Sequence, residues 1–319
     1  MILHIFFIAH LKLKNIFIRQ SFTFLFLIIS NIKQEYKQDF SQMNYLPFRL
    51  RLMLGLANPF KIKPQHCALN EQIQQIVAQF LIKKQISPTS SIYRFKMNDE
   101  RKVLGIQLGE NIQIGVPGNQ QENHIAKVHP LTRIDDPAIV DVLVDEQIPE
   151  QQFFSNLKEK QEVVIKSDQN KKFVYDGFGK IKIFNQGQVT QKKVDYLGII
   201  VQGYHISKVF SLIEGISTNG DKTNISILYV NSNLDESLFI DELTWYAEEK
   251  KIHLGVLFEK VPDGVPVMKG KFQKHHVSDF MPPVDQEFHL IVAGSNTFQD
   301  ECLGHLKSLG YKNENITLY

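Results

Sequence analysis

One segment constrains the fold of this chain more than any other: residues 196–216, where a buried strand, a turn and an amphipathic helix follow one another. Residues 197–201 are apolar apart from one glycine, and Val209, Leu212, Ile213 and Ile216 recur at the spacing of one helix face. A strand that leads through a short turn into a helix begins a βα unit, and βα units build parallel sheets. We therefore expect an α/β domain that contains this segment.

The turn of this βα unit lacks most of the glycines that a phosphate-binding turn needs. A nucleotide phosphate is held by backbone N–H groups at a helix N-terminus, and glycines let it approach the backbone closely. Here Gly203 stands between Gln202 and the bulky pair Tyr204 and His205. The segment thus indicates the fold of a nucleotide-binding unit, but its residues argue against phosphate binding.

Downstream of residue 194, apolar strands alternate with helices. Strands are predicted at 224–230, 252–258 and 288–294, and helices at 237–251 and 297–309. Near-continuous apolar strands separated by helices are typical of a parallel sheet covered on both faces. The second half of the globular chain is therefore predicted to be an α/β domain.

Upstream of residue 190, several short strands occur with few helices between them. They are predicted at 91–97, 111–116, 140–144, 162–166 and 180–184, with a short helical segment at 151–157. The apolar stretch 72–83 fits either a helix or a strand. This pattern favours a small antiparallel barrel or sandwich.

Net charge and cysteine content exclude some classes of function. The formal net charge is +2, and no block of Lys and Arg with interleaved aromatic residues occurs, so we expect no nucleic-acid partner. Cys67 and Cys302 lie far apart and form neither a metal-ligand spacing nor a disulfide framework. No metal site is predicted.

The first 67 residues are expected to form a leader outside the globular part. Residues 1–34 contain no Asp or Glu and include the apolar run 21–30, which is shorter than the roughly 20 residues of a spanning helix. A basic, apolar stretch at 43–55 could lie against a membrane or a partner. We expect membrane contact through residues 1–60. The alternatives are a cleaved targeting segment and a translation start at Met43.

The globular part resembles the cytochrome b5 reductase branch of the ferredoxin reductase superfamily. The resemblance covers roughly residues 68–319 and depends on the order and spacing of several strings, found at 92–95, 103–112, 135–136, 178–181, 231–243, 281–283 and 309–311. It implies an antiparallel β-barrel of the FAD-binding type at 68–190, followed by an α/β parallel-sheet domain of the NAD-binding type at 191–319. In the family, NADH passes a hydride to the flavin, and electrons leave singly.

The flavin motifs of the family are altered in this chain. The motif Arg-Pro-Tyr-Thr falls on His129, Pro130, Leu131 and Thr132, so the arginine that pairs with the FAD pyrophosphate and the tyrosine that packs on the flavin ring are both replaced. Lys127 or Arg133 could supply the charge, although neither is at the motif position. The second flavin motif, Gly-Lys-Met-Ser, falls near residues 151–154, where long or aromatic side chains are expected to crowd a helix N-terminus.

The NADH motifs are altered in the same way. Gly-Gly-Thr-Gly-Ile-Thr-Pro falls on residues 202–208, where Gly203 and the hydroxyl of Ser207 are retained. Cys-Gly-Pro-Pro falls on residues 293–296, where Gly294 is retained and Ala293 replaces the cysteine that lies beside the nicotinamide. The motif positions that remain for cofactor contact are His129, Pro130, Leu131, Thr132, Gly203, Ser207 and Gly294, and we expect them to be degenerate.

These replacements predict a reductase homologue that binds neither FAD nor NADH, a pseudoenzyme that serves as a structural or accessory subunit of a larger, membrane-bound complex. The expected location is the mitochondrial membrane, with the endoplasmic reticulum membrane as the alternative, or the cytosol if translation starts at Met43. The competing hypothesis is an active NADH-dependent FAD oxidoreductase that passes electrons to a one-electron acceptor such as a cytochrome.

Other polar residues are expected to be structural. A catalytic role for His205 would need a carboxylate partner that the sequence does not indicate. His275 and His276 are expected on opposite faces of a strand, which does not suit metal binding. The pairs 135–136 and 241–242 are read as a loop and a helix face. No catalytic residue is predicted.

Overall fold

The computed structural model describes residues 60, 62–117, 125–185, 187–261 and 267–319. The predicted leader, residues 1–67, lies outside the described residues except for 60 and 62–67, so the expected membrane contact stays a prediction. Within the described ranges, no helix is long and apolar enough to cross a bilayer. A short 3-10 helix, η3 (Pro64–His66), precedes the first strand.

The first described sheet is antiparallel and is arranged as a barrel. In the described residues it has the order β4-β3-β6-β1-β2-β5. Its strands are β1 (Gln75–Gln85), β2 (Ser90–Met97), β3 (Ile112–Gly115), β4 (Ile125–Val128), β5 (Ile139–Asp145) and β6 (Glu162–Ser167). A bridge between Pro130 and Val142 joins the chain after β4 to β5, which brings the two edges of the sheet together. The stretch 72–83, left open between helix and strand, is therefore mostly strand β1.

Alternation along the strands explains the barrel core. In β2, Tyr93, Phe95 and Met97 are buried while Arg94 between them is exposed, as expected when successive side chains point to opposite faces. A 3-10 helix, η5 (Pro149–Asn156), adds Phe154, which packs on Tyr93 at a ring-centroid distance of 5.2 Å. These aromatic side chains fill the barrel interior. A small antiparallel sheet of β7 (Phe173–Gly177), β8 (Lys180–Asn185) and β9 (Gln188–Lys193) follows.

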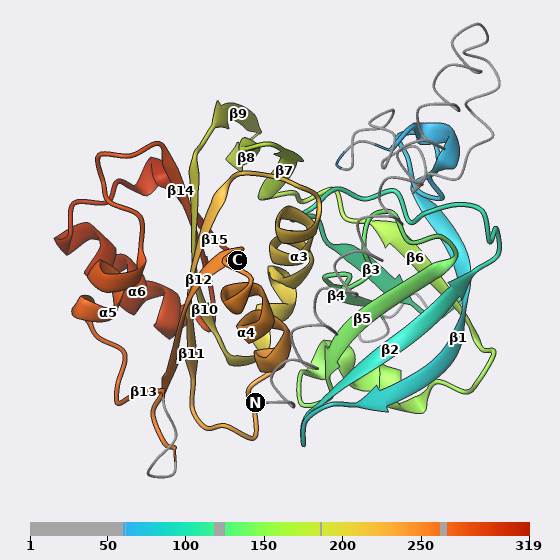
Figure 1. Cartoon of the computed structure of the whole chain (residues 1–319). Helices are drawn as coiled ribbons and strands as arrows, with labels where there is room; N and C mark the ends of the chain where they lie inside the picture. The colour runs from blue at the N-terminus through green and yellow to red at the C-terminus, as the bar shows by residue number, and fades with distance from the viewer. Residues whose placement is uncertain (1–59, 61, 118–124, 186, 262–266) are drawn as a thin grey trace, which may run out of the picture. The chain divides into compact units, whose positions relative to one another are not determined.

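The second half contains a parallel sheet with helices on both faces, as predicted (Figure 1). Its described strands have the order β13-β12-β11-β10-β14-β15. They are β10 (Tyr196–Gln202), β11 (Asn224–Asn231), β12 (Ile252–Phe258), β13 (Met268–Lys269), β14 (Phe288–Ala293) and β15 (Ile316–Leu318). Helices α3 (Phe210–Thr218) and α4 (Ile240–Glu248) pack on one face, and α5 (Lys274–Phe280) and α6 (Asn296–Ser308) on the other. A short 3-10 helix, η7 (Asn313–Asn315), precedes β15.

Three local expectations differ from the structure. A 3-10 helix, η6 (Gly203–Lys208), separates β10 from α3, where a turn alone was expected. Helix α4 begins at Ile240 because Phe239 has a left-handed φ of 57°, which interrupts the helix predicted from residue 237. His275 and His276 lie in helix α5, so the strand predicted for them is wrong; their ring centroids are 3.9 Å apart.

Candidate functional site

One of the apolar clusters of the described residues contains side chains from both the barrel half and the parallel sheet. Leu108 and Leu143 from the first half belong to the same buried cluster as Val201 and Ile213 from the second. Gly215 of α3 lies so close to Leu108 that an added Cβ would be 2.5 Å from its side chain. Hence the junction between the two halves is packed like a protein interior over much of its area.

Tyr204 links the two halves where the NADH motif falls. It is in η6, and its hydroxyl lies 3.1 Å from the carbonyl oxygen of Leu143 and 3.0 Å from Oε1 of Gln151. The same Gln151 oxygen accepts a hydrogen bond of 2.8 Å from the backbone N–H of Asp145. Burial raises the pKa of Tyr204 to about 12, so the hydroxyl stays protonated and can donate.

The first flavin-motif positions have structural partners. Leu131 donates its backbone N–H to the carbonyl of Asp141 at 2.8 Å and packs its side chain against the shared core. Thr132 accepts the Asp141 N–H at 2.5 Å. Pro130 forms the bridge to Val142. These three residues attach the chain after β4 to β5, a role that requires no ligand.

His129 is the flavin-motif residue that faces the junction. Its ring lies edge-on to that of Tyr319, with 5.4 Å between centroids. Burial and the neighbouring Lys208 lower the pKa of His129 to about 3, so the imidazole is neutral near pH 7. It therefore cannot replace the fixed charge of the family's arginine.

Sequence reasoning missed Tyr319 as a junction residue. Its hydroxyl donates to the carbonyl of Gly109 at 2.8 Å, and its own N–H donates to the carbonyl of Val292 at 2.9 Å. Its carbonyl accepts from Nε2 of Gln299 at 2.6 Å. A lone aromatic residue after a short apolar strand gives no local signal for this contact, which depends on how β15 pairs with β14.

The second flavin-motif region departs from expectation. Phe153 and Phe154 stack on each other at 4.4 Å, and Phe154 is 1% exposed in the barrel core. They therefore fill the barrel and do not crowd a helix N-terminus at the junction. Gln151, the first residue of this group, is the one that reaches Tyr204.

The retained glycines and serine differ in environment. Gly203 has a φ of 49°, and a Cβ added there would meet no atom within 4 Å. A Cβ at Gly294 would be 2.4 Å from the Phe298 ring, so packing of α6 alone explains this glycine. Ser207 is buried and lines the cavity described next.

A cavity of about 330 Å³ lies at the junction between the two halves. Of the seven predicted site residues, the structure places His129 and Ser207 in its wall, while the other five lie outside it. Among the described residues of the wall, none is Asp or Glu. The charged and aromatic lining residues are Lys127, His129, Lys172, Tyr204, His205, Lys208 and Tyr319.

Two of the cavity lysines titrate below their ordinary range. Burial, then repulsion from Lys172 and Lys127, lowers the pKa of Lys208 to about 8. Burial and Lys127 also lower the pKa of Lys172. Burial, with Lys208 nearby, lowers the pKa of His205 to about 4. The cavity is therefore a concentration of positive charge, of which Asp168 neutralises the Lys127 part.

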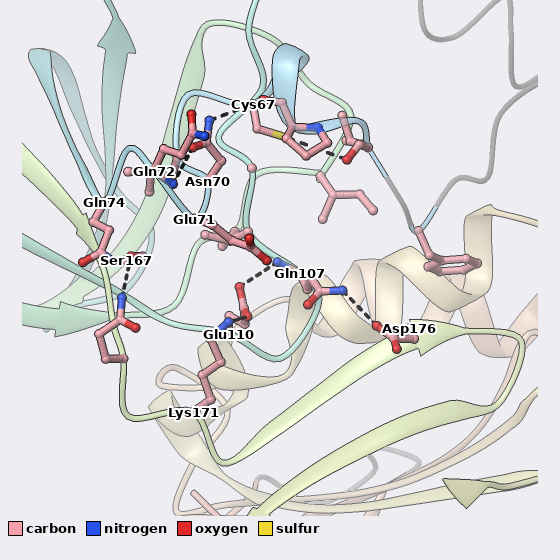
Figure 2. Close-up of a pocket in the computed structure, with 18 of the residues that line it drawn as sticks. Cys67, Asn70, Glu71, Gln72, Gln74, Gln107, Glu110, Ser167, Lys171 and Asp176 are labelled. Carbon is pink, nitrogen blue, oxygen red and sulfur yellow. Dashed lines mark hydrogen bonds and ion pairs between the residues drawn. The ribbon is translucent and has the colours of Figure 1, made fainter. Parts of the chain in front are cut away.

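A larger pocket of about 900 Å³ lies elsewhere on the first half and contains none of the seven predicted site residues (Figure 2). Most of its charged groups pair with one another. Glu110 forms an ion pair with Lys171 at 2.5 Å and accepts the Gln107 N–H at 2.9 Å, and Gln107 donates to Asp176 at 2.8 Å. Because most charges of this pocket are paired, the junction cavity, which three lysines line, is the stronger candidate site.

Comparisons with known proteins identify relatives and solved structures with the same fold. No family model matches the chain. An NADH-cytochrome b5 reductase 2 of Danio rerio is 23% identical over 278 residues, which cover 81% of this chain and 89% of that protein. A plasma membrane-associated coenzyme Q6 reductase of Saccharomyces cerevisiae is 24% identical over 235 residues, covering 71% of this chain and 69% of the relative. The chain therefore resembles NADH-cytochrome b5 reductases over most of its length.

Solved structures support the fold of this reductase-like chain. The cytochrome b5 reductase domain of Ulva prolifera nitrate reductase aligns with a TM-score of 0.70 at 18% identity, over 79% of this chain and 100% of that one. A flavohaem-like FAD/NAD-binding domain of a nitric oxide dioxygenase from Vibrio cholerae gives 0.60 at 14% identity, over 77% and 98% of the two chains. At these identities the likeness concerns the fold, a barrel followed by an α/β domain, and confirms that prediction.

No cluster in the described ranges brings together three His, Cys, Asp or Glu side chains that could hold a metal ion. His275 and His276 have no third ligand there, and His276 instead accepts the Gln273 N–H through Nδ1 at 3.0 Å.

Proposed function

We propose that this reductase-like protein acts as a structural or accessory subunit of a larger, membrane-bound complex and does not use FAD or NADH in the manner of its family. The observation that carries the proposal is the Tyr204 bridge, because it ties the NADH-motif turn to Leu143 and Gln151 across the junction. A dinucleotide would need this turn to face it with small residues. The bridge gives the turn a role within the protein.

The chemistry of the flavin-motif residues supports the same proposal. FAD needs positive charge at its pyrophosphate and a planar contact for its ring system, and His129 and Leu131 supply neither. Charge-assisted hydrogen bonds are worth about 1.5 to 3 kcal/mol each, so losing a bidentate arginine and a backbone cradle together would weaken affinity by several orders of magnitude. Tyr319 also packs against His129, so protein already contacts this ring.

The second candidate is an active NADH-dependent flavoprotein reductase. It is favoured by the relatives, whose names describe NADH-cytochrome b5 and coenzyme Q6 reductases. The lysines of the junction cavity could then replace the missing arginine. In that case the acceptor would be a one-electron carrier such as a cytochrome, and FAD and NAD would be the cofactors.

The proposed location is a mitochondrial membrane, reached through residues 1–60, with the endoplasmic reticulum as the alternative. The acid-poor, basic start of the sequence supports a targeted or membrane-associated protein. One relative is described as plasma membrane-associated. The partners would be protein subunits, and the small net charge gives no reason to expect nucleic acid.

The test is the visible absorbance of the protein purified from its own cells, before and after incubation with excess FAD. We expect no flavin bands in either sample and elution with other protein subunits in gel filtration. An active relative handled in parallel would show that the purification retains flavin. A stoichiometric flavin spectrum that NADH bleaches would overturn the accessory role and establish the reductase.

A further inference from the structure

We propose that the junction cavity binds a small phosphate monoester, with its dianionic phosphate among Lys127, Lys172 and Lys208. This inference rests on the proposed function, because it assigns to the cavity a ligand other than FAD. None of the three lysines occupies a basic position of the family's flavin or nicotinamide motifs. The cavity shares His129 and Ser207 with the motif positions, and the three lysines are what would distinguish its ligand from the family's cofactors.

The charge balance of the cavity is the first argument. Three lysines line it, and none of the described lining residues is acidic. Lys127 forms an ion pair with Asp168, and Lys172 donates to the carbonyl of Leu318 at 3.0 Å. Lys208 has no hydrogen bond or ion pair within the described part of the chain. Lys208 is partly buried, and an ammonium group that loses water without gaining a partner is costly, so a bound anion would reduce that cost.

The neutral groups in the wall are the second argument. Nδ1 of His205 is buried and has no hydrogen-bond partner among the described residues. Ser207 and Asn111 also line the cavity. Hydroxyl, amide and imidazole groups can complete the hydrogen bonds of a phosphate once lysines supply the charge. The site thus combines positive charge with polar lining residues.

Size and shape select the class of ligand. A volume of about 330 Å³ is at the lower end of the roughly 300 to 1,000 Å³ of small-molecule pockets, so a compact ligand is favoured over a dinucleotide. The rings of Tyr204 and Tyr319 line the same space and can contact an organic group attached to the phosphate. A monoester carries a charge of −1.5 to −2 on one group near pH 7, which suits three lysines around one cavity. A dicarboxylate carries its two charges on separate groups, so we expect it to fit three lysines around one cavity less well.

Proton linkage gives this site a distinctive pH dependence. Lys208 shares the cavity wall with Lys127, Lys172, His129, His205, Tyr204 and Tyr319, and Asp168 pairs with Lys127. Burial, then Lys172 and Lys127, lowers the pKa of Lys208 to about 8 in the free protein. A bound dianion favours the charged lysine and raises its pKa, so binding takes up a proton near pH 8. The affinity for AMP should fall as the pH rises from 7 to 9, because the phosphate of a monoester is already almost wholly dianionic over this range.

The experiment is isothermal titration of the full-length protein with inorganic phosphate, with AMP as a monoester and with succinate as a dicarboxylate. We expect phosphate and AMP to bind at one site and succinate to bind at least tenfold more weakly. Lys208→Met should weaken phosphate binding by about ten- to a hundredfold, since a charge-assisted contact is lost. Lys180→Met removes an exposed lysine of β8 outside the cavity and should leave the affinity unchanged.

Several outcomes would overturn the proposal. These are no binding of phosphate or AMP, equal binding of succinate, or unchanged affinity in Lys208→Met. Circular dichroism checks the fold of each variant, and Lys172→Met provides a second cavity variant if Lys208→Met is unfolded. Titration with FAD separates the two proposals. If FAD binds and excludes phosphate, the proposed function is contradicted. If the protein stays colourless and binds no phosphate, only this inference is contradicted.

Discussion

Single residues at the family's motif positions have acquired contacts within the protein. Thr132 keeps the hydroxyl that the motif requires, but it uses it to accept the Asp141 N–H. Tyr204 stands where the NADH motif has a threonine and reaches across to Leu143. A substitution at a binding position thus changes two things: the groups available to a ligand and the contacts within the protein. Residue identity alone could not distinguish these two consequences.

The buried His289 in the α/β half should make the free energy of unfolding depend on pH. His289 is 0% exposed, lies 2.8 Å from the Thr317 hydroxyl through Nε2, and has a pKa lowered to about 3 by burial. In the unfolded chain it takes up a proton below about pH 6.5, so folding stability should fall as pH decreases from 6.5 toward 3, by up to about 1.4 kcal/mol per pH unit.

His289→Gln should reduce this pH dependence, because glutamine does not take up a proton. Urea unfolding at pH 7 and pH 5 measures the difference for each protein. His275→Gln, at an exposed position of α5, is the matched control and should behave as the unmodified protein does. The same loss of stability in His289→Gln would contradict the assignment.

Elements of the α/β half are positioned by close packing, and glycines allow it at a few places. β14 leads through Gly294 into α6, whose N-cap Ser295 accepts the Phe298 N–H at 3.3 Å. The Phe298 ring covers Gly294 so closely that a Cβ would be 2.4 Å away. A motif glycine that the family resemblance assigns to cofactor contact is therefore needed here to seat a helix.

Gly294→Ala should destabilise the protein by about 1 to 3 kcal/mol, because the added methyl group forces the Phe298 ring to move. Gly304→Ala in the same helix meets no atom within 4 Å and should be neutral or stabilising by up to about 1 kcal/mol. Thermal unfolding of both variants provides the comparison. Equal midpoints for the two variants would mean that packing does not explain Gly294.

At the scale of the whole molecule, the shared core joins the two halves of the described chain. Leu143 of β5 is 1% exposed and belongs to the same cluster as the buried residues of β10 and α3. The proposed domains, 68–190 and 191–319, should therefore depend on each other for stability. Separate domains with small interfaces usually move and unfold independently.

We expect a single calorimetric unfolding transition. Leu143→Ala should lower its midpoint without splitting it, with a loss of about 2 to 5 kcal/mol from the lost burial and the cavity left behind. Ala substitution at the exposed Leu234 provides a control that should change little. Two separate transitions in the unmodified protein, or in Leu143→Ala alone, would show that the junction is not a common core.

The sequence by itself determined the class of each half, mostly strands first and then alternating strands and helices. Periodicity distinguishes the strands of the first half from the alternating strands and helices of the second, because strand and helix repeats differ. The sequence also showed that His129, Leu131 and His205 stand in place of the family's motif residues. The helical position of His275 and His276 was not, since a seven-residue helix is too short to establish a period.

Only the tertiary structure decided what surrounds the motif positions. The contacts of Tyr204 with Leu143 and of Tyr319 with Gly109 join residues 61 and 210 positions apart. The convergence of Lys127, Lys172 and Lys208 on one cavity likewise joins three separate stretches of chain. Local patterns predict which elements form because they reflect neighbouring residues. A binding site depends on which distant side chains meet, and that is settled when the elements pack.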